Sequence, residues 1–125
     1  MFCIAGAELK RKGQPMQDLV IYQRMYDFML YLFPIVDRFP RSERFALCSN
    51  IKDCCINLAR MIVRANKARN KRPLLFDIDV ALEELRLLLR FSRDRRHLSN
   101  KSYECSARQI GEVGRLLGGW LKSTG

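Results

Sequence analysis

Three arginines in the second half of the chain have the residue type and the spacing to bind an anion. Arg86, Arg90 and Arg93 follow one another at intervals of four and three residues, so a helix would place them on one narrow line. Guanidinium groups bind phosphate and carboxylate oxygens in a forked geometry. Because few acidic residues lie near them in the sequence, we predict that this line faces a groove, a central channel or a bound anion.

A second basic row, Arg60, Arg64 and Lys67, would lie on the helix face opposite to the apolar positions around it. Two interpretations stay open for this row. It binds phosphates, or it is a solvated face whose cations complement the helix C-terminus and pair with the acids of the next helix. Those acids are Asp77, Asp79 and Glu83.

A third basic line lies near the C-terminus at intervals of seven residues. Its members are Lys101, Arg108, Arg115 and Lys122. Because Glu104 and Glu112 are interleaved with it, we expect a solvated face rather than a binding site.

The residues needed for catalysis are not present at a useful spacing. His97 is the only histidine, and beside Arg95 and Arg96 at a helix end it is expected to complement the helix C-terminus. Without a Glu-x-x-His pair, a di-iron bundle site is excluded. The adjacent Glu83 and Glu84 would point in different directions on a helix. We therefore expect a protein that is not an enzyme and that needs no cofactor or metal.

The charge balance favours a polyanionic partner. The chain holds 23 Lys and Arg against 13 Asp and Glu, which gives a formal net charge of +10. Much of the excess lies in residues 41–72, where nine basic residues are accompanied only by Glu43 and Asp53. Such an imbalance is typical of proteins that bind nucleic acid, an anionic membrane face or an acidic protein.

Cysteine usage and hydropathy predict a soluble cytoplasmic protein. The five cysteines include no CxxC pair, so we expect small buried side chains in a reducing compartment rather than disulfides or a metal cluster. The apolar N-terminal residues 1–7 are too short for a signal-peptide core. The longest apolar run, residues 28–36, contains Pro34 and is far shorter than the roughly 18 residues of a membrane span.

Helical periodicity predicts a single all-α domain. Apolar residues repeat at three and four across residues 18–122, whereas residues 1–17 are expected to form a flexible leader. Short connections between long helices are typical of an antiparallel, up-down four-helix bundle. The expected helices cover residues 18–38, residues 42 to 66 or 69, residues 74–96 and residues 100–122.

The helix starts and the apolar seams follow from the same pattern. Ser42 and Ser99 are expected to cap the second and fourth helices, because a serine hydroxyl can accept a bond from an otherwise unpaired backbone N–H. The seam of the first helix is Tyr22, Met25, Tyr26, Met29, Leu32, Phe33 and Val36. The second is Cys48, Ile51, Cys55, Leu58 and Ile62, and the fourth is Tyr103, Ile110, Val113, Leu117 and Trp120.

The third helix has an unusual pattern in its second half. Leucines and a phenylalanine cover most of its circumference: Leu85, Leu87, Leu88, Leu89 and Phe91. A helix that is apolar nearly all round is usually buried, but a four-helix bundle of this length cannot bury every side of one helix. We therefore expect self-association.

Four glycines lie within the expected fourth helix, and three of them are spaced three and four residues apart. Gly111, Gly114 and Gly118 would share one face, and each costs about 1 kcal/mol relative to alanine. Because a phosphate cradle needs its glycines at a helix start, we set nucleotide binding aside. We expect these glycines to allow close helix packing.

Four segments together resemble a known family. They are YLFPI at 31–35, FPRSERF at 39–45, LRLLLRF at 85–91 and VGRLLGGW at 113–120. In this order and spacing the chain resembles, over residues 18–122, a family of four-helix-bundle proteins. That family includes proteins encoded in intervening sequences of 23S ribosomal RNA genes and Avd, the accessory variability determinant of diversity-generating retroelements.

The resemblance implies a homopentameric barrel with a positively charged surface. For the Avd branch it also implies association with a reverse transcriptase and template RNA during error-prone complementary-DNA synthesis. Arg86 and Arg90 match the family's basic positions on its third helix, so the resemblance implies contact with nucleic acid or the polymerase there. Arg60, Arg64, Lys67 and Arg93 are candidates from the spacing of their rows alone.

Our expectation is a basic, non-enzymatic accessory protein that binds a reverse transcriptase and RNA, with DNA as an open alternative. Phosphates would be held by sequence-tolerant, salt-sensitive contacts. Base readout is not expected, because most aromatic residues lie at core positions. One rival is a cytosolic oligomeric scaffold, like the ribosomal intervening-sequence relatives, that binds an acidic protein. The other is a peripheral membrane protein, which the sequence favours less because it offers no exposed Trp- and Phe-rich face.

Overall fold

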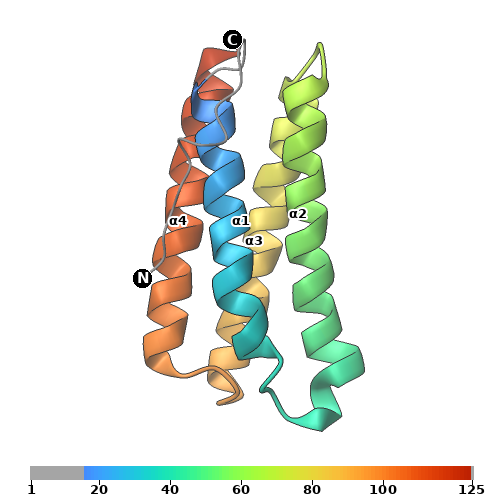
Figure 1. The fold of residues 1–125 in the computed structure, drawn as a ribbon, viewed down its shortest axis with the longest axis vertical. Coiled ribbons are helices and arrows are strands. Elements are labelled where there is room, and N and C mark those ends of the chain that lie inside the picture. Colours follow the sequence, from blue (N-terminus) through green and yellow to red (C-terminus); the bar gives the residue numbers. More distant parts are fainter. Residues whose placement is uncertain (1–15, 125) are drawn as a thin grey trace.

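Four helices arranged as an up-down bundle make up the computed structural model, which describes residues 16–124 except the side chains of residues 16–19. The helices are α1 (Met16–Val36), α2 (Ser49–Lys67), α3 (Arg72–Asp94) and α4 (Asn100–Ser123). α1 packs against α2 and α4, and α3 packs against the same two helices, so α1 and α3 occupy opposite corners (Figure 1). No strand forms in residues 16–124. The all-α bundle is therefore confirmed, whereas most of the expected leader lies outside the described residues.

The core follows the predicted seams except on α1. All five seam residues expected for the second helix are buried, as are Ile110, Val113, Leu117 and Trp120 of α4. On α1 the buried positions are Ile21, Met25, Phe28, Leu32 and Val36. The prediction was wrong for Tyr22 and Tyr26, which are 39% and 50% exposed. The buried face of α1 instead contains Ile21 and Phe28, so it is turned slightly about the helix axis from the predicted face.

The approach to α2 differs from the predicted Ser42 cap. Residues Arg41–Glu43 form a 3-10 turn, η2, and Arg44–Cys48 form a π-helical turn, η3, before α2 begins at Ser49. Pro40 precedes this first turn, and the Ser42 hydroxyl makes no capping bond. The capping prediction was wrong because the chain enters the helix through a tight turn closed by the bond from Glu43 N to Pro40 O.

The π turn decides which side chains at this entry reach the core. In an unbroken α-helix of about 100° per residue, Arg44 would lie on the buried face with Leu47 and Ile51. A π turn accommodates an extra residue and shifts the residues before it around the helix axis. Arg44 and Phe45 are consequently both exposed, while Leu47 and Cys48 are buried.

The remaining helix ends are closed by identifiable groups. Ser99 caps α4 as predicted, with its Oγ accepting a bond of 3.1 Å from Ser102 N. Lys71 Nζ donates to the backbone oxygens at the C-terminal end of α2, namely those of Ala65, Asn66 and Ala68. α3 begins at Arg72, two residues earlier than expected, because Pro73 is suited to the first helical turn.

A Schellman turn closes α3. Arg96 N donates to Arg93 O at 2.8 Å, and His97 N donates to Ser92 O at 2.9 Å. Arg96 has a φ of 66°, the left-handed conformation that this turn requires and that glycine usually supplies. The chain then reverses into α4.

The outer side of α3 is apolar, as the sequence indicated. Leu85 and Leu89 are buried, but Leu87 and Phe91 are 67% and 52% exposed. Phe76 and Val80 are exposed on the same helical face. We call Phe76, Val80, Leu87 and Phe91 the α3 apolar stripe.

The glycines of α4 do not support the packing predicted for them. Among the described residues, a Cβ built at Gly111 or Gly118 would meet no atom within 4 Å, so none of the helices α1, α2 and α3 approaches them closely. At Gly114 a Cβ would lie 2.9 Å from Arg86 Nη2. The close-packing prediction was therefore wrong within the protomer, and Gly114 instead makes room for the Arg86 side chain.

Candidate functional site

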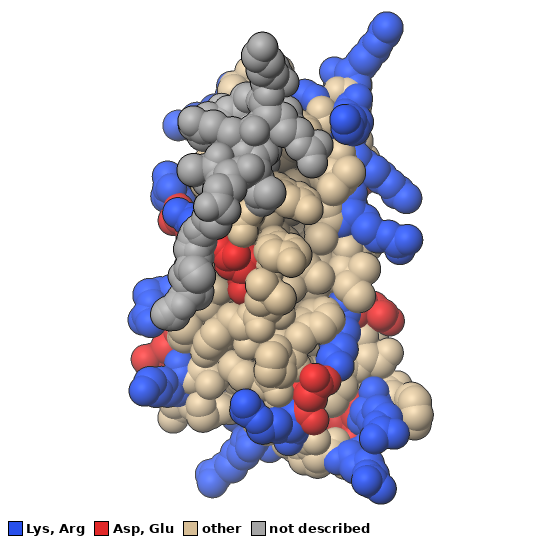
Figure 2. All heavy atoms as spheres, in the orientation of Figure 1, with Lys and Arg blue, Asp and Glu red and all other residues tan. Residues whose placement is uncertain are grey.

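The basic row of α2 is exposed and forms no ion pair with any described residue. Arg60, Arg64 and Lys67 are all exposed, and Figure 2 shows Lys and Arg side chains projecting along this edge of the bundle. Among the described residues none of the three forms an ion pair. The alternative in which they pair with the acids of the next helix is thus not what the structure shows, although cations at the C-terminal end of α2 still complement its dipole.

The three arginines of α3 share a line but not an environment. Arg90 is exposed and makes no ion pair within the described part of the chain. Arg86 pairs with Glu83 one turn away and lies over Gly114. Arg93 pairs with Asp94 at 3.0 Å, and its guanidinium lies 4.5 Å from the centre of the Tyr103 ring. Only Arg90 therefore has a fully available charge, although side chains of Arg86 and Arg93 stay partly exposed.

The two rows are not brought together within one protomer. Lys67 ends α2 and lies beside the start of α3, whereas Arg93 lies at the far end of α3. At about 1.5 Å per residue these ends are about 30 Å apart. A single polyanion would have to run along the bundle, or bridge neighbouring copies, to meet both rows.

Five further arginines gather at the end of the bundle that holds the α1–α2 and α3–α4 connections. They are Arg38, Arg41, Arg44, Arg95 and Arg96, which we call the basal arginines. Figure 1 shows both connections at the lower end of the bundle. All five are exposed. Arg95 pairs with Glu43 at 3.3 Å, and the other four make no ion pair among residues 16–124. The spacing of basic residues in the sequence did not predict this cluster, although an up-down topology brings these two connections to one end.

A hydrogen-bonded pair joins the two basal connections. His97 Nε2 lies 2.9 Å from Glu43 Oε2, and the side chains are 13% and 14% exposed. The Phe39 ring packs on the imidazole with 5.6 Å between centroids. The hydrogen bond with His97, aided by Arg95, holds the pKa of Glu43 below its ordinary value of 4.5. His97 thus ties the α3–α4 turn to the entry of α2, a role that the sequence did not predict.

This pair predicts a dependence of stability on pH. Because the pKa of Glu43 is lowered in the folded protein, its stabilising effect is present above pH 4.5 and is lost as the pH falls through the folded-state pKa. Glu43→Gln should therefore lower the urea midpoint at pH 7, and this difference from the wild type should shrink below pH 4.5.

The matched control is Glu112→Gln. A bond from Arg115 also lowers the pKa of Glu112, but this pair lies on the surface of α4, where an ion pair contributes little. Equal urea midpoints for Glu43→Gln and the wild type at pH 7 would contradict a stabilising role for the Glu43–His97 pair.

The cysteines of the described residues differ in burial, and Cys55 is the most deeply buried. Burial raises the pKa of the Cys55 thiol to about 12, so it stays protonated near neutral pH. Cys48, Cys54, Cys55 and Cys105 are all free thiols. Within the described residues no group of three His, Cys, Asp or Glu is placed to hold a metal ion. The same part of the chain contains no helix with the length and hydropathy to cross a membrane.

Comparison with known proteins adds a family match. A family model described as bAvd-like matches residues 19–124, which include all four helices of the bundle apart from the first residues of α1. No curated protein matches the chain.

Proposed function

The chain belongs to the bAvd-like family, and from that premise we propose that it is a non-enzymatic accessory protein of a diversity-generating retroelement. In this proposal it binds RNA and the reverse transcriptase and holds them together during mutagenic complementary-DNA synthesis. The protein supplies positive charge and a scaffold, and the polymerase supplies the chemistry.

The observation that carries the proposal is the set of exposed cations without acidic partners. Arg60, Arg64, Lys67 and Arg90 are exposed and unpaired among the described residues. Basic side chains that neutralise phosphates release counterions, and this release drives sequence-independent binding. The same cations paired with local carboxylates would have little charge left for a phosphate chain.

Assembly into a ring would bring several such surfaces together. The α3 apolar stripe lies on one corner of the bundle, and a second exposed apolar stripe, Tyr22, Tyr26 and Leu30, lies on α1 at the opposite corner. We call this second set the α1 stripe. Two different apolar faces on one protomer favour head-to-tail contacts, which form a ring when the rotation between neighbouring copies closes. A homopentamer, the assembly implied by the family resemblance, fits this arrangement.

A titration with single-stranded RNA tests the proposal. Wild-type affinity should fall steeply with salt, and Arg60→Gln, Arg64→Gln and Lys67→Gln together should weaken binding. If each contacts one phosphate, the slope of log K against log salt should decrease by about 2, at about 0.7 for each lost contact on a single strand. Fluorescence anisotropy of a labelled oligonucleotide at several salt concentrations measures both effects.

The charge-matched control changes Lys101, Arg108 and Lys122 to Gln on α4. These residues are also exposed but belong to the line that we interpret as a solvated face. An equal loss of affinity in both triple variants would show that the α2 row has no special role. Wild-type binding that is absent or unaffected by salt would contradict the proposal itself.

The genomic neighbourhood tests the retroelement assignment separately. A reverse transcriptase gene and a template–variable repeat pair beside the reading frame are expected. A reading frame that lies inside a ribosomal RNA gene would favour the rival scaffold that binds an acidic protein.

A further inference from the structure

The most exposed large apolar side chain among the described residues is an aromatic ring with an arginine beside it. Phe45 is 89% exposed and lies on the π turn that leads into α2. An aromatic ring in this position contributes nothing to the core, so its burial does not stabilise the protomer. It also lies apart from both apolar stripes, which belong to α1 and α3.

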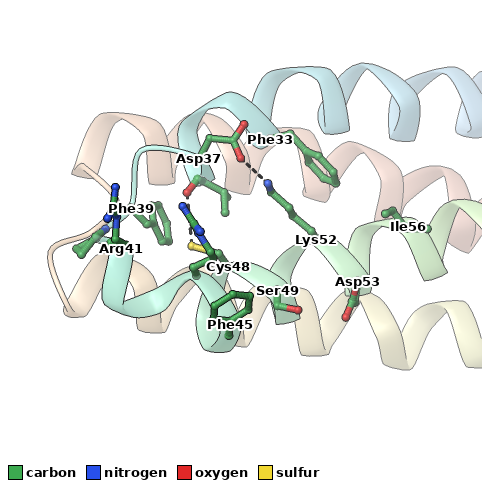
Figure 3. Close-up of a pocket in the computed structure, with 13 residues that line it drawn as sticks. Phe33, Asp37, Phe39, Arg41, Phe45, Cys48, Ser49, Lys52, Asp53 and Ile56 are labelled. Carbon is green, nitrogen blue, oxygen red and sulfur yellow. Dashed lines mark hydrogen bonds and ion pairs between the residues drawn. The ribbon is translucent and has the colours of Figure 1, made fainter.

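Phe45 forms one side of a groove at the basal end of the bundle. The groove has a volume of about 770 Å³ and lies between the end of α1 and the start of α2 (Figure 3). Its apolar lining comes from Phe33, Val36, Phe39, Phe45, Cys48 and Ile56. Figure 3 shows Lys52 reaching from α2 toward Asp37, with which it forms an ion pair, and Lys52 Nζ lies 5.5 Å from the Phe33 ring centre.

The charges around the groove favour an anionic occupant. Lys52 and Asp37 neutralise each other, which leaves Arg41 and Arg44 against Asp53 in the groove lining. Arg44 lies 5.9 Å from the centre of the Phe45 ring, so a cation already lies beside the aromatic face. The unpaired Arg38 and Arg96 belong to the same basal cluster.

An aromatic ring set among several unpaired cations matches the chemistry of a single nucleic-acid strand. A strand offers repeated phosphates for the arginines and a flat base that can stack on the exposed ring. An acidic peptide would satisfy one or two arginines but has no regular partner for an isolated phenyl ring. Charge complementarity therefore favours the polynucleotide.

We propose that Phe45, Arg41 and Arg44 form a base-stacking site for single-stranded RNA. One base stacks on the Phe45 ring at the groove, and the flanking phosphates contact Arg41 and Arg44. The site rests on the proposed RNA-binding function and adds to it a position where a base, and not only the backbone, is held. It differs from the expectation that bases are not contacted because most aromatic residues lie at core positions.

Ring-specific variants of Phe45 test the site. Base–aromatic stacking is typically strong enough that Phe45→Leu should weaken binding of a ten-residue oligouridylate at least about fivefold. Phe45→Tyr keeps the ring and should retain wild-type affinity. Because the side chain is almost fully exposed, we expect both variants to fold, and circular dichroism checks this.

A fluorescent reporter at the same position gives an independent readout. Phe45→Trp should be quenched by oligouridylate but not by an abasic oligomer of equal length and charge. The wild-type emission, which comes from the buried Trp120, provides the background. Quenching by the base-containing strand alone would support stacking.

The possible failures are distinguishable. If the wild type binds RNA in a salt-dependent manner but Phe45→Leu binds equally well and Phe45→Trp is not quenched, the stacking site is wrong and the proposed function stands. If the wild type binds no RNA, both fail. Quenching of Phe45→Trp by an acidic peptide and not by oligouridylate would identify a protein-binding groove and overturn the stacking proposal.

Discussion

Replacing Leu85 by Ala should lower the free energy of unfolding by about 2–5 kcal/mol, the usual cost of removing a fully buried leucine side chain. Leu85 has no exposed surface and belongs to the main hydrophobic core of the bundle. The substitution removes apolar contacts and leaves a cavity that the surrounding helices fill only in part. Urea unfolding followed by far-ultraviolet circular dichroism measures the change.

Val63→Ala is the control for this prediction. Val63 is exposed on α2 outside both apolar stripes, so its truncation should change the free energy of unfolding by no more than about 0.5 kcal/mol. If Leu85→Ala had an equally small effect, the buried face of α3 would not be the one that contains Leu85.

Acidic residues on the α3 apolar stripe should dissociate the assembly without unfolding the protomer. The double variant Leu87→Asp, Phe91→Asp places two charges on side chains that are exposed in the protomer but buried in the proposed ring. Burying unpaired charges at an apolar contact is strongly unfavourable. Sedimentation should show the mass falling to that of one 14.6 kDa chain, with unchanged helical circular dichroism.

The control for this variant is Ile56→Asp with Val63→Asp. These side chains are also exposed but belong to neither stripe, so the assembly should persist. A wild-type protein that is monomeric at the same concentration would contradict the proposed self-association.

Complementation between variants tests the head-to-tail geometry. A second double variant, Tyr26→Asp and Leu30→Asp, breaks the α1 stripe and should also be monomeric. Mixed with the α3 variant, it should form a dimer, because one intact α1 stripe and one intact α3 stripe are then available. If each stripe met its own copy instead, each double variant alone would form dimers through its intact stripe, and mixing the two variants would give no mixed dimer.

The sequence was sufficient to predict the four helices and most of the buried core residues. A period of 3.6 residues determines which side chains share a face, and that period correctly assigned the seam of the second helix and most of the seam of α4. It failed on α1, where tyrosines flank the true seam and are apolar enough to be mistaken for it. It also failed at Ser42, because the 3-10 and π turns before α2 depend on packing at the bundle end rather than on local propensity.

The candidate site was predictable only in part. The row on α2 and the line on α3 follow from spacing. Glu83 stands three residues before Arg86 and Asp94 follows Arg93, so the ion pairs of these two arginines were also within reach of the sequence. The clustering of the basal arginines and the exposure of Phe45 could be recognised only from the tertiary structure. Their proximity arises from two connections far apart in sequence, and the exposure of Phe45 arises from the π turn.

The left-handed conformation of Arg96 has a cost in backbone strain and a benefit in charge. Glycine would adopt its left-handed backbone without strain, whereas an arginine there costs about 1–2 kcal/mol. Arginine, however, brings a cation to the basal end that glycine cannot supply. Laboratory evolution for heat resistance alone would favour glycine at this corner, whereas evolution for retention of a polyanion would keep the strained arginine.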